Sequence, residues 1–462
     1  MTLDSISFIA FICAVFSLHW VVFARSAMLQ NIVLLAANLC FYATWDFRAL
    51  LLVVSVVVWT WFAGRCARRW RWVAALGVLG LITLLGVFKY YDFFITSIQW
   101  AVDARFKTLN LILPIGISFY VFQAIGYIVD VTRGEKIEGQ YGFVEFAVFM
   151  TFFPQILAGP IERAASMLPQ FSKRRMFNES LAVEGCRQIL WGAFAKFVVA
   201  DNFCTITETL LGCSSLSAGM AWCGAVGYAV QIYADFSGYS NMAVGIGKLL
   251  GVRLRQNFAY PYFATGFSDF WRRWHISLTT WFRDNVYFPL GGSRCPMVKT
   301  LRNIWIVFLL SGLWHGAAWT FVAWGAIHAL FLSIERLFKG IANKVPDNFA
   351  NGIVSRMVML PGIIIAWLVF RAADFGDAWR CVAALFDFCK GAVWPRIPQS
   401  VYAVAVLGAV AMFVKEYAGR GHEFGLKKVP CSRIVRWSLY LVLAALVICC
   451  NGGGSSFIYQ KF

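Results

Sequence analysis

The sequence is dominated by long apolar runs separated by short polar segments. A helix needs roughly 20 apolar residues to cross a bilayer, so a chain of 462 residues with this pattern can supply about ten to twelve spans. Only 14% of its residues are charged, against roughly 25% in soluble domains. The sequence therefore predicts an all-α, polytopic integral membrane protein. We place the runs near 6–24, 30–45, 48–64, 72–91, 110–129, 183–200, 219–250, 302–334, 353–370, 400–414 and 434–450.

The distribution of charge predicts how the first spans are oriented. Arg65, Arg68, Arg69 and Arg71 separate the third and fourth runs, whereas Asp46 lies between the second and third. Because basic residues are enriched in cytoplasmic loops, we expect the arginine cluster in the cytoplasm and the N-terminus outside. We attribute the net charge of +18 to such loops and to contact with anionic membrane lipid, not to nucleic acid.

Several classes of site lack support in this sequence. The 13 cysteines show no C-x-x-C spacing, and those inside apolar runs, such as Cys13 and Cys223, are expected to pack as small hydrophobic residues. We find no Walker loop, dinucleotide fingerprint, zinc-protease motif or serine-esterase motif, and we expect no metal site. The first run has neither a basic flank nor a cleavage site, so we expect a retained span.

His315 is the strongest candidate for chemistry, because it is ionisable and lies inside a run that otherwise reads as membrane-spanning. Such residues usually face a bundle interior or a cavity. On one continuous helix, Ser311 and Trp319 would share its face, which suits a narrow substrate channel. A neutral imidazole can act as a general base or a nucleophile. The alternative is a histidine that only hydrogen-bonds a neighbouring helix.

The remaining histidines other than His275 are expected to be structural. His328 follows His315 by thirteen residues, which turns it about 140° away on a continuous helix. The two imidazoles could converge only if the helix breaks. We also favour packing or surface roles for His19 and His422.

An aromatic, basic segment forms a second candidate region. Its apolar residues recur at helical spacing after a possible cap at Ser268 or Asp269, namely at Phe270, Trp274, Leu278 and Trp281. Arg272, Arg273 and Arg283 could hold the phosphates of a donor such as coenzyme A, with Trp274 beside them and His275 at the reacting group. The alternative is an interfacial helix that binds lipid headgroups.

A third segment places Gln231, Asp235 and Tyr239 on one helical face. A buried carboxylate needs a partner, so Asp235 could orient an imidazole, pair with an arginine or tie helices together. We favour the structural role. The stretch 151–160 is rich in Pro and Gly, and it reads equally well as a segment that ends or re-enters beside a cavity and as a surface loop.

Five motifs in order resemble the membrane-bound O-acyltransferase (MBOAT) family, nearest to its alginate O-acetylation branch, with the teichoic acid D-alanyl transferases more distant. They are PIGISFYVFQ (114–123), FPQILAGPI (153–161), YADFSGYS (233–240), FWRRWHISL (270–278) and LWHG (313–316). The resemblance implies a single membrane domain over 1–462, with N-terminal helices to about 100, core motifs over 110–335 and C-terminal helices over 350–462. It also implies re-entrant or interfacial helices around a central funnel.

The resemblance further implies an acetyl relay across the bacterial inner membrane. Acetyl-CoA would be the cytoplasmic donor, with no bound cofactor, and an extracytoplasmic SGNH-type acetyltransferase or another polysaccharide-modifying partner would receive the group. The product would be an O-acetylated exopolysaccharide, alginate-like or cellulose.

Within this resemblance, His315 matches the family's essential membrane histidine, and His275 matches its second recurrent histidine. His315 would act as a base, or else carry the acetyl group covalently. The ending at 457–462 keeps the family's aromatic pattern only in part. Two alternatives of other classes are a polytopic transporter or flippase and a structural subunit of a polysaccharide export complex.

Overall fold

The structure is a computed structural model that describes residues 5–103, 106–134, 137, 141–342, 349–389, 391–419 and 432–450. These residues form helices and connecting segments, with no strand among them, which confirms the all-α prediction. The chain forms two compact units that alternate along the sequence. Unit 1 comprises Met1–Ile189 and Ala243–Arg255, and unit 2 comprises Leu190–Met242 and Gln256–Phe462. His422 and the aromatic ending at 457–462 lie outside the described residues.

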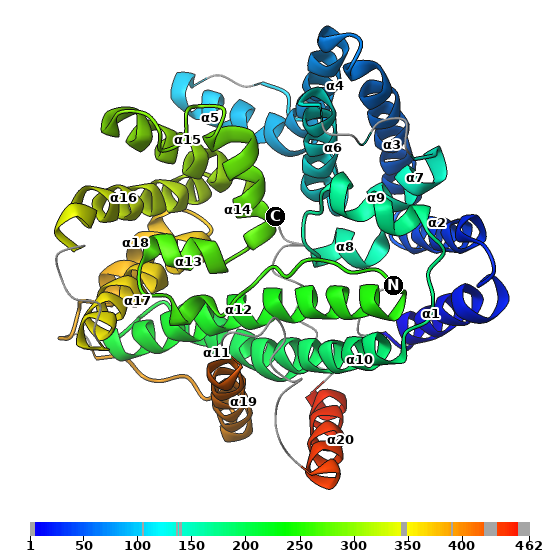
Figure 1. Ribbon diagram of the computed structural model, residues 1–462. Helices are drawn as coiled ribbons and strands as arrows, with labels where there is room; N and C mark the ends of the chain where they lie inside the picture. The colour runs from blue at the N-terminus through cyan, green and yellow to red at the C-terminus, as the bar shows by residue number, and fades with distance from the viewer. Residues whose placement is uncertain are drawn as a thin grey trace. The chain divides into compact units, whose positions relative to one another are not determined.

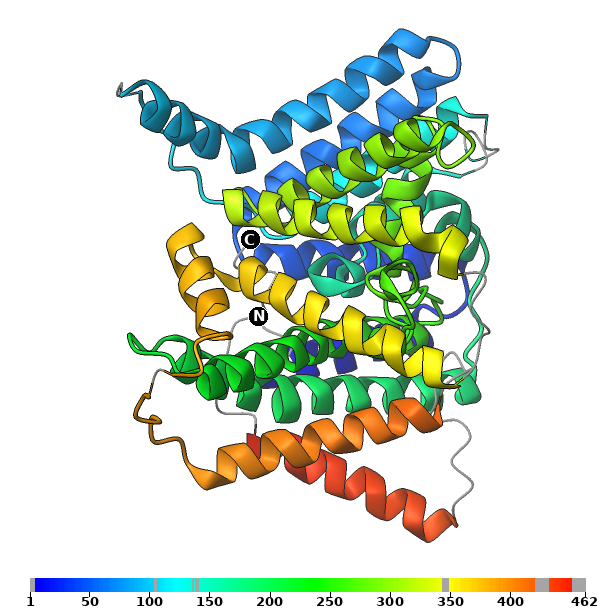
Figure 2. The same ribbon diagram turned by 90° about the vertical axis from the view of Figure 1, so that its left-hand side faces the viewer.

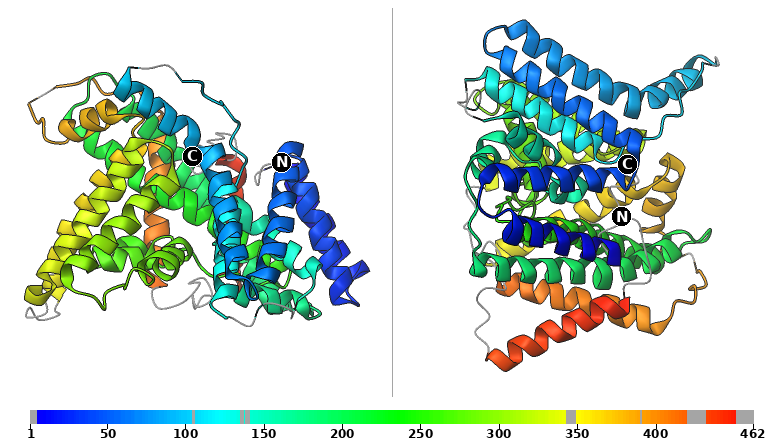
Figure 3. Two further views of the ribbon diagram at one scale, coloured as in Figure 1. Left: turned by 90° about the horizontal axis from the view of Figure 1, so that it is seen from above. Right: turned by 90° about the vertical axis from the view of Figure 1, so that its right-hand side faces the viewer.

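Unit 1 contains the N-terminal helices. They are α1 (Ile6–Ser17), η1 (Leu18–Val22), α2 (Ala27–Ala43), α3 (Phe47–Ala67), α4 (Arg71–Leu85), η2 (Gly86–Tyr90), α5 (Tyr91–Val102), α6 (Ile117–Thr132), α7 (Phe143–Thr151), α8 (Phe153–Ala158), α9 (Ala164–Ser172) and most of α10 (Glu179–Ala193). Helices α3, α4 and α6 pack together, as the blue and cyan ribbons show (Figure 3). A Cβ on Gly77 of α4 would lie 2.8 Å from the Cβ of Ala63 of α3, so small side chains permit this close packing.

Residues 151–155, 159 and 160 are buried, and the surface-loop alternative is therefore wrong. Asn38 of α2 bridges the break between α7 and α8, since its Oδ1 accepts from the N–H of Phe153 (3.0 Å) and its Nδ2 donates to Oγ1 of Thr151 (3.1 Å). Nε2 of Gln155 donates to Oε1 of Gln123 (2.6 Å). Side chains thus satisfy the polar groups of an irregular segment that protein surrounds, as the membrane requires.

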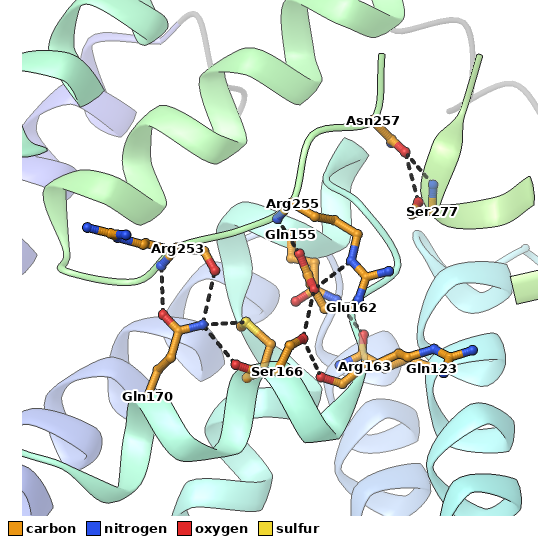
Figure 4. Close-up of polar contacts among 11 residues, drawn as sticks. Gln123, Gln155, Glu162, Arg163, Ser166, Gln170, Arg253, Arg255, Asn257 and Ser277 are labelled. Atoms are coloured by element: carbon orange, nitrogen blue, oxygen red, sulfur yellow. Dashed lines mark hydrogen bonds and ion pairs between the residues drawn. The ribbon is translucent and has the colours of Figure 1, made fainter. Parts of the chain in front are cut away.

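Two polar pairs hold the segment after α12 in unit 1 (Figure 4). Glu162 accepts from the backbone N–H of Arg255 (2.6 Å) and from its Nε (3.0 Å). The amide of Gln170 bonds both the N–H (2.8 Å) and the carbonyl (3.0 Å) of Arg253. These bonds satisfy both backbone groups of residue 253 and the N–H of residue 255, which belong to no helix.

Unit 2 contains the remaining helices. They are η3 (Phe194–Ala200), α11 (Asp201–Leu211), most of α12 (Ala218–Leu249), η4 (Pro261–Phe263), α13 (Phe267–Arg273), α14 (Ile276–Phe282), η5 (Arg283–Tyr287), α15 (Met297–His315), α16 (Trp319–Ala342), α17 (Phe349–Arg371), α18 (Phe375–Ala384), α19 (Gln399–Ala418) and α20 (Arg433–Cys450). Helices α15 and α16 lie side by side (Figure 1), and α19 and α20 both contact the π-helical segment η3 (Figure 2).

Seven helices or continuous helical stretches in the described part are long and apolar enough to cross a membrane. They are Phe47–Ala67, Arg71–Val102, Glu179–Leu211, Met297–His315, Trp319–Phe338, Gln399–Ala418 and Arg433–Cys450. Four further apolar helices are shorter, at Ser7–Val22, Ala27–Ala43, Ile117–Thr132 and Phe143–Gln155. This pattern confirms a multi-pass membrane protein.

Three boundaries differ from the prediction. The run 302–334 is two helices, because α15 ends at His315 and α16 begins at Trp319. The run 110–129 becomes helical only from Ile117, because Pro114 disfavours a helix before it and Gly116 adopts a positive φ of 75°. Helix α13 is preceded by Gly266, not capped at residue 268 or 269.

Candidate functional site

A break between α13 and α14 positions the first candidate histidine. His275 has a φ of 42°, which is uncommon for residues other than glycine. Neighbouring backbone holds the break: the N–H of Ala259 donates to the carbonyl of Arg273 (3.0 Å), and the N–H of Ile276 donates to the carbonyl of Asn257 (2.9 Å). The predicted continuous helix is therefore interrupted at this histidine, whose backbone is held in a sparsely populated conformation.

The imidazole of His275 is fully buried. Its Nδ1 lies 3.2 Å from Oδ1 of Asn257, an oxygen that also accepts from the N–H (3.2 Å) and Oγ (2.8 Å) of Ser277 (Figure 4). Because an amide oxygen only accepts hydrogen bonds, we assign the proton to Nδ1, which leaves the lone pair on Nε2. Burial lowers the pKa of His275 to about 3, so the ring is neutral near pH 7.

The second candidate histidine, His315, is the last residue of α15 and is buried. Its ring packs edge-on against Trp324 (centroids 4.9 Å apart) and Phe370 (5.3 Å). The indole of Trp314 lies 5.0 Å from the His315 ring and 5.8 Å from the His275 ring. One aromatic side chain therefore contacts both candidate histidines, which sequence reasoning had placed on separate segments.

A pocket of about 240 Å³ is lined by residues from α13 to α16, and neither candidate histidine is among them. Three arginines from three elements line it: Arg272 of α13, Arg283 of η5 and Arg336 of α16. Ser311 also lines it, one helical turn before His315 on α15. The pocket is smaller than those that hold a whole drug-sized ligand, so it has room for a phosphate group or another part of a larger donor.

The other predicted donor-binding residues do not line this pocket. Trp274 is fully buried and packs on Phe270 (5.5 Å, stacked) and Trp367 (4.8 Å), which favours a role in the aromatic core. Arg273 pairs with Asp269 of the same helix (3.0 Å). Trp319 begins α16 and is half exposed, so its predicted place on the same helical face as His315 is wrong.

The predicted supporting residues join helices around a buried lysine. Asp235 pairs with Lys196 of η3 (2.8 Å), and Lys196 also pairs with Asp201 (2.7 Å) and lies 5.4 Å from the ring centre of Tyr239. Gln231 accepts a hydrogen bond from Thr207 of α11 at its Oε1 (2.6 Å). Of the three options for Asp235, this geometry favours the one that ties helices together.

The histidines expected to be structural have packed surroundings where the structure describes them. His328 is buried, accepts from the indole N–H of Trp271 at its Nδ1 (3.3 Å) and packs on Trp324 (4.8 Å). His315 and His328 therefore contact the same indole, because the helix breaks between them. His19 is buried in unit 1 beside Arg175. Among the described residues, no group of three or more His, Cys, Asp or Glu could hold a metal ion.

Sequence reasoning missed three residues of this region. Lys196 carried the same signal as His315, an ionisable group inside an apolar run, and could have been found. Arg336 follows the apolar run of α16 and looks in sequence like an ordinary flanking residue. Asn257 lies in a connecting segment with no pattern that distinguishes it.

Comparisons with known proteins identify the family of this chain. Residues 37–371 match the family model described as MBOAT, membrane-bound O-acyltransferase family. The chain is 39% identical over 374 residues to the "Probable alginate O-acetylase AlgI" of Azotobacter vinelandii, covering 78% of this chain and 74% of that protein. It is 33% identical over 396 residues to the "Peptidoglycan O-acetyltransferase" of Helicobacter pylori (79% and 75%). A more distant relative is the "Teichoic acid D-alanyltransferase" of Bacillus subtilis, 27% identical over 281 residues (58% and 70%).

These relatives are all acyl-transferring proteins, and they support an enzyme over the transporter and structural-subunit alternatives. The matched region spans both histidines, the arginine-lined pocket and the aromatic cluster between them. The chain therefore belongs to the membrane-bound O-acyltransferase family and is an acyltransferase.

Proposed function

We propose that this acyltransferase is an O-acetyltransferase of the bacterial inner membrane. It takes an acetyl group from cytoplasmic acetyl-CoA and relays it to an extracytoplasmic acetyltransferase partner that modifies an exopolysaccharide. One observation carries the proposal: His315 lies buried at the end of a membrane helix, one turn from a serine in an arginine-lined pocket. The choice of an acetyl group and of a polymeric acceptor is supported by the relatives named as alginate and peptidoglycan O-acetyl-transferring proteins.

The arginine-lined pocket would hold the phosphates of the donor. Arg272 and Arg336 form no ion pair with any described residue, whereas Arg283 is neutralised in part by Asp284 (2.8 Å). Guanidinium groups bind phosphate oxygens in bidentate geometry and are favoured wherever planar recognition of phosphate matters. Acetyl-CoA brings phosphates and a thioester in one molecule, so the same pocket would position the thioester toward α15.

We assign the role of general base to His315. Its neutral ring takes the proton of the acceptor hydroxyl, the hydroxyl oxygen attacks the thioester carbonyl, and the carbon–sulfur bond breaks to release the coenzyme A thiolate. The proton then passes from the imidazolium to the thiolate. The C-terminal end of α15 carries partial negative charge, which favours the positive charge that His315 gains during this step. His275, buried at a strained break and linked to Trp314, would position the neighbouring indole.

A covalent route is the competing chemistry at the same residue. In that route His315 attacks the thioester itself and carries the acetyl group to the acceptor. The two routes differ in one product: the covalent route leaves acetyl label on the protein when acetyl-CoA is supplied without an acceptor, and the base route leaves none.

Proteoliposomes test the proposal directly. The purified protein is reconstituted with its extracytoplasmic partner and an oligosaccharide acceptor in the lumen, and radiolabelled acetyl-CoA is added outside. We expect labelled oligosaccharide in the lumen only when both proteins are present. Consumption of acetyl-CoA with no labelled saccharide would contradict the acceptor assignment, and absence of any donor consumption would contradict the acetyl-CoA donor.

A further inference from the structure

Unit 1 contains a second pocket that plays no part in the proposed acetyl transfer. It encloses about 740 Å³, within the range of pockets that hold a complete small ligand. Its walls come from the end of α2, the turn into α3, the first turns of α3 and the extended residues 110–115. From its chemistry, we propose that this pocket binds one anionic phospholipid.

One end of the pocket carries buried hydrogen-bond donors. Tyr42 lines the pocket and is only 4% exposed, and its hydroxyl has no hydrogen-bond partner among the described residues. The same holds for the buried indole N–H of Trp45, three residues further on. Because buried polar groups in folded proteins nearly always have a partner, these two donors indicate an acceptor-rich ligand beside them.

The charged groups at this end favour an anion. Arg48 is exposed, lines the pocket and forms no ion pair with a described residue. Asp46 is the only carboxylate among the described residues that line the pocket, and it already caps α3 by accepting from the backbone N–H of Arg48 (2.8 Å). The guanidinium is therefore left to pair with a ligand phosphate, while the carboxylate is engaged by the helix terminus.

The rest of the pocket is apolar and opens through apolar side chains. Leu51 is 54% exposed and Ile112 is 76% exposed, while Leu52 and Phe88 line the pocket between them. A water-soluble anion would leave these apolar walls in contact with water. A purely apolar molecule would leave the hydrogen-bond donors of Tyr42 and Trp45 without an acceptor.

The position of the pocket matches a lipid of the surrounding bilayer. The turn joins α2, one of the shorter apolar helices, to the start of α3, which is long and apolar enough to cross a membrane. We therefore expect the turn at the depth where headgroups meet acyl chains. A phospholipid would place its phosphate on Arg48, its ester oxygens near Tyr42 and Trp45, and one acyl chain along Leu52 and Phe88.

Native mass spectrometry of the delipidated full-length protein tests this site. The probes are dioleoyl phosphatidylglycerol, which is anionic, and dioleoyl phosphatidylethanolamine, which is not. We expect one tightly bound phosphatidylglycerol per chain and weaker phosphatidylethanolamine. Arg48→Gln should raise the Kd for phosphatidylglycerol roughly tenfold or more, the loss expected for a hydrogen bond to a charged group.

Two leucine variants separate this pocket from general lipid contact. Leu52→Trp fills the pocket and should abolish the tight binding, whereas Leu76→Trp places the same side chain at an exposed position of α4 outside it and should not. Tyr42→Phe removes one hydroxyl with little change in shape and should weaken binding several-fold. Equal affinity for the two lipids, or unchanged phosphatidylglycerol binding in Leu52→Trp, would overturn the proposal.

Discussion

The contact between α15 and α16 allows a sharp prediction, because it brings backbone against backbone. A Cβ added to Gly325 of α16 would lie 2.2 Å from the carbonyl oxygen of Phe308 in α15. The reciprocal position, Gly312 of α15, would place a Cβ 2.3 Å from the carbonyl oxygen of Phe321. Neither oxygen can rotate away as a flexible side chain could, so Gly325→Ala requires the two helices to separate.

The expected cost follows from two opposing effects. Inserting a methyl group into a packed contact typically costs about 1–3 kcal/mol, and a backbone clash belongs at the upper end. Alanine in a helix interior is favoured over glycine by up to about 1 kcal/mol. Gly325→Ala should therefore lower the free energy of unfolding by about 1–2 kcal/mol. Gly86→Ala is the matched control, because a Cβ there has no atom within 4 Å.

Thermal unfolding in detergent, followed by tryptophan fluorescence, measures the effect. Gly325→Ala should melt a few degrees below the unmodified protein, and Gly86→Ala should melt at the same temperature or higher. Acetyl transfer by Gly325→Ala should also fall, because His315 ends the displaced helix. A Gly325→Ala protein that is as stable as the Gly86→Ala control would refute the close-packing argument.

Three further predictions concern charge. Burial lowers the pKa of His275 to about 3, below its value near 6.5 in the unfolded chain, so the unfolded chain binds an extra proton between these pH values. The melting temperature should therefore fall when the pH is lowered from 7.5 to 5, and it should fall less steeply in His275→Asn. Lys196→Met should cost roughly 3–5 kcal/mol in chemical unfolding, because it leaves Asp201 and Asp235 buried without their cation, and adding Asp235→Asn should recover part of that loss. Arg336→Gln should raise the KM for acetyl-CoA but not for acetyl-pantetheine, which lacks the phosphates; equal effects on both donors would exclude phosphate binding.

The fold class was predictable because hydropathy reports directly on the bilayer. The errors of the sequence-based prediction were local and have physical causes. The run 302–334 is apolar on average on both sides of Gly316, so its mean hydropathy does not mark the turn that separates α15 from α16. The helix break at His275 depends on hydrogen bonds with residues 257 and 259 of a preceding segment, which no local pattern reveals.

The candidate site was predictable residue by residue only in part. His315, His275, Arg272 and Arg283 were identifiable because ionisable groups are conspicuous in an apolar chain. Their grouping was not, since it depends on the turn that brings α16 beside α15 and delivers Arg336 to the same pocket. Helical periodicity also placed Trp319 on the face of His315, an assignment that holds only if the helix continues past residue 315.

The most direct test compares two buried histidines that contact the same tryptophan. His315 and His328 lie 4.9 and 4.8 Å from the ring centre of Trp324, but only His315 is assigned a role in the chemistry. The measurement is the rate of free thiol release from acetyl-CoA by purified protein in the presence of an acceptor, with melting temperatures matched. We predict a loss of at least about 100-fold for His315→Ala and a change of no more than a few-fold for His328→Gln. Turnover by His315→Ala within a few-fold of the unmodified protein would contradict the assignment of His315 as the catalytic residue.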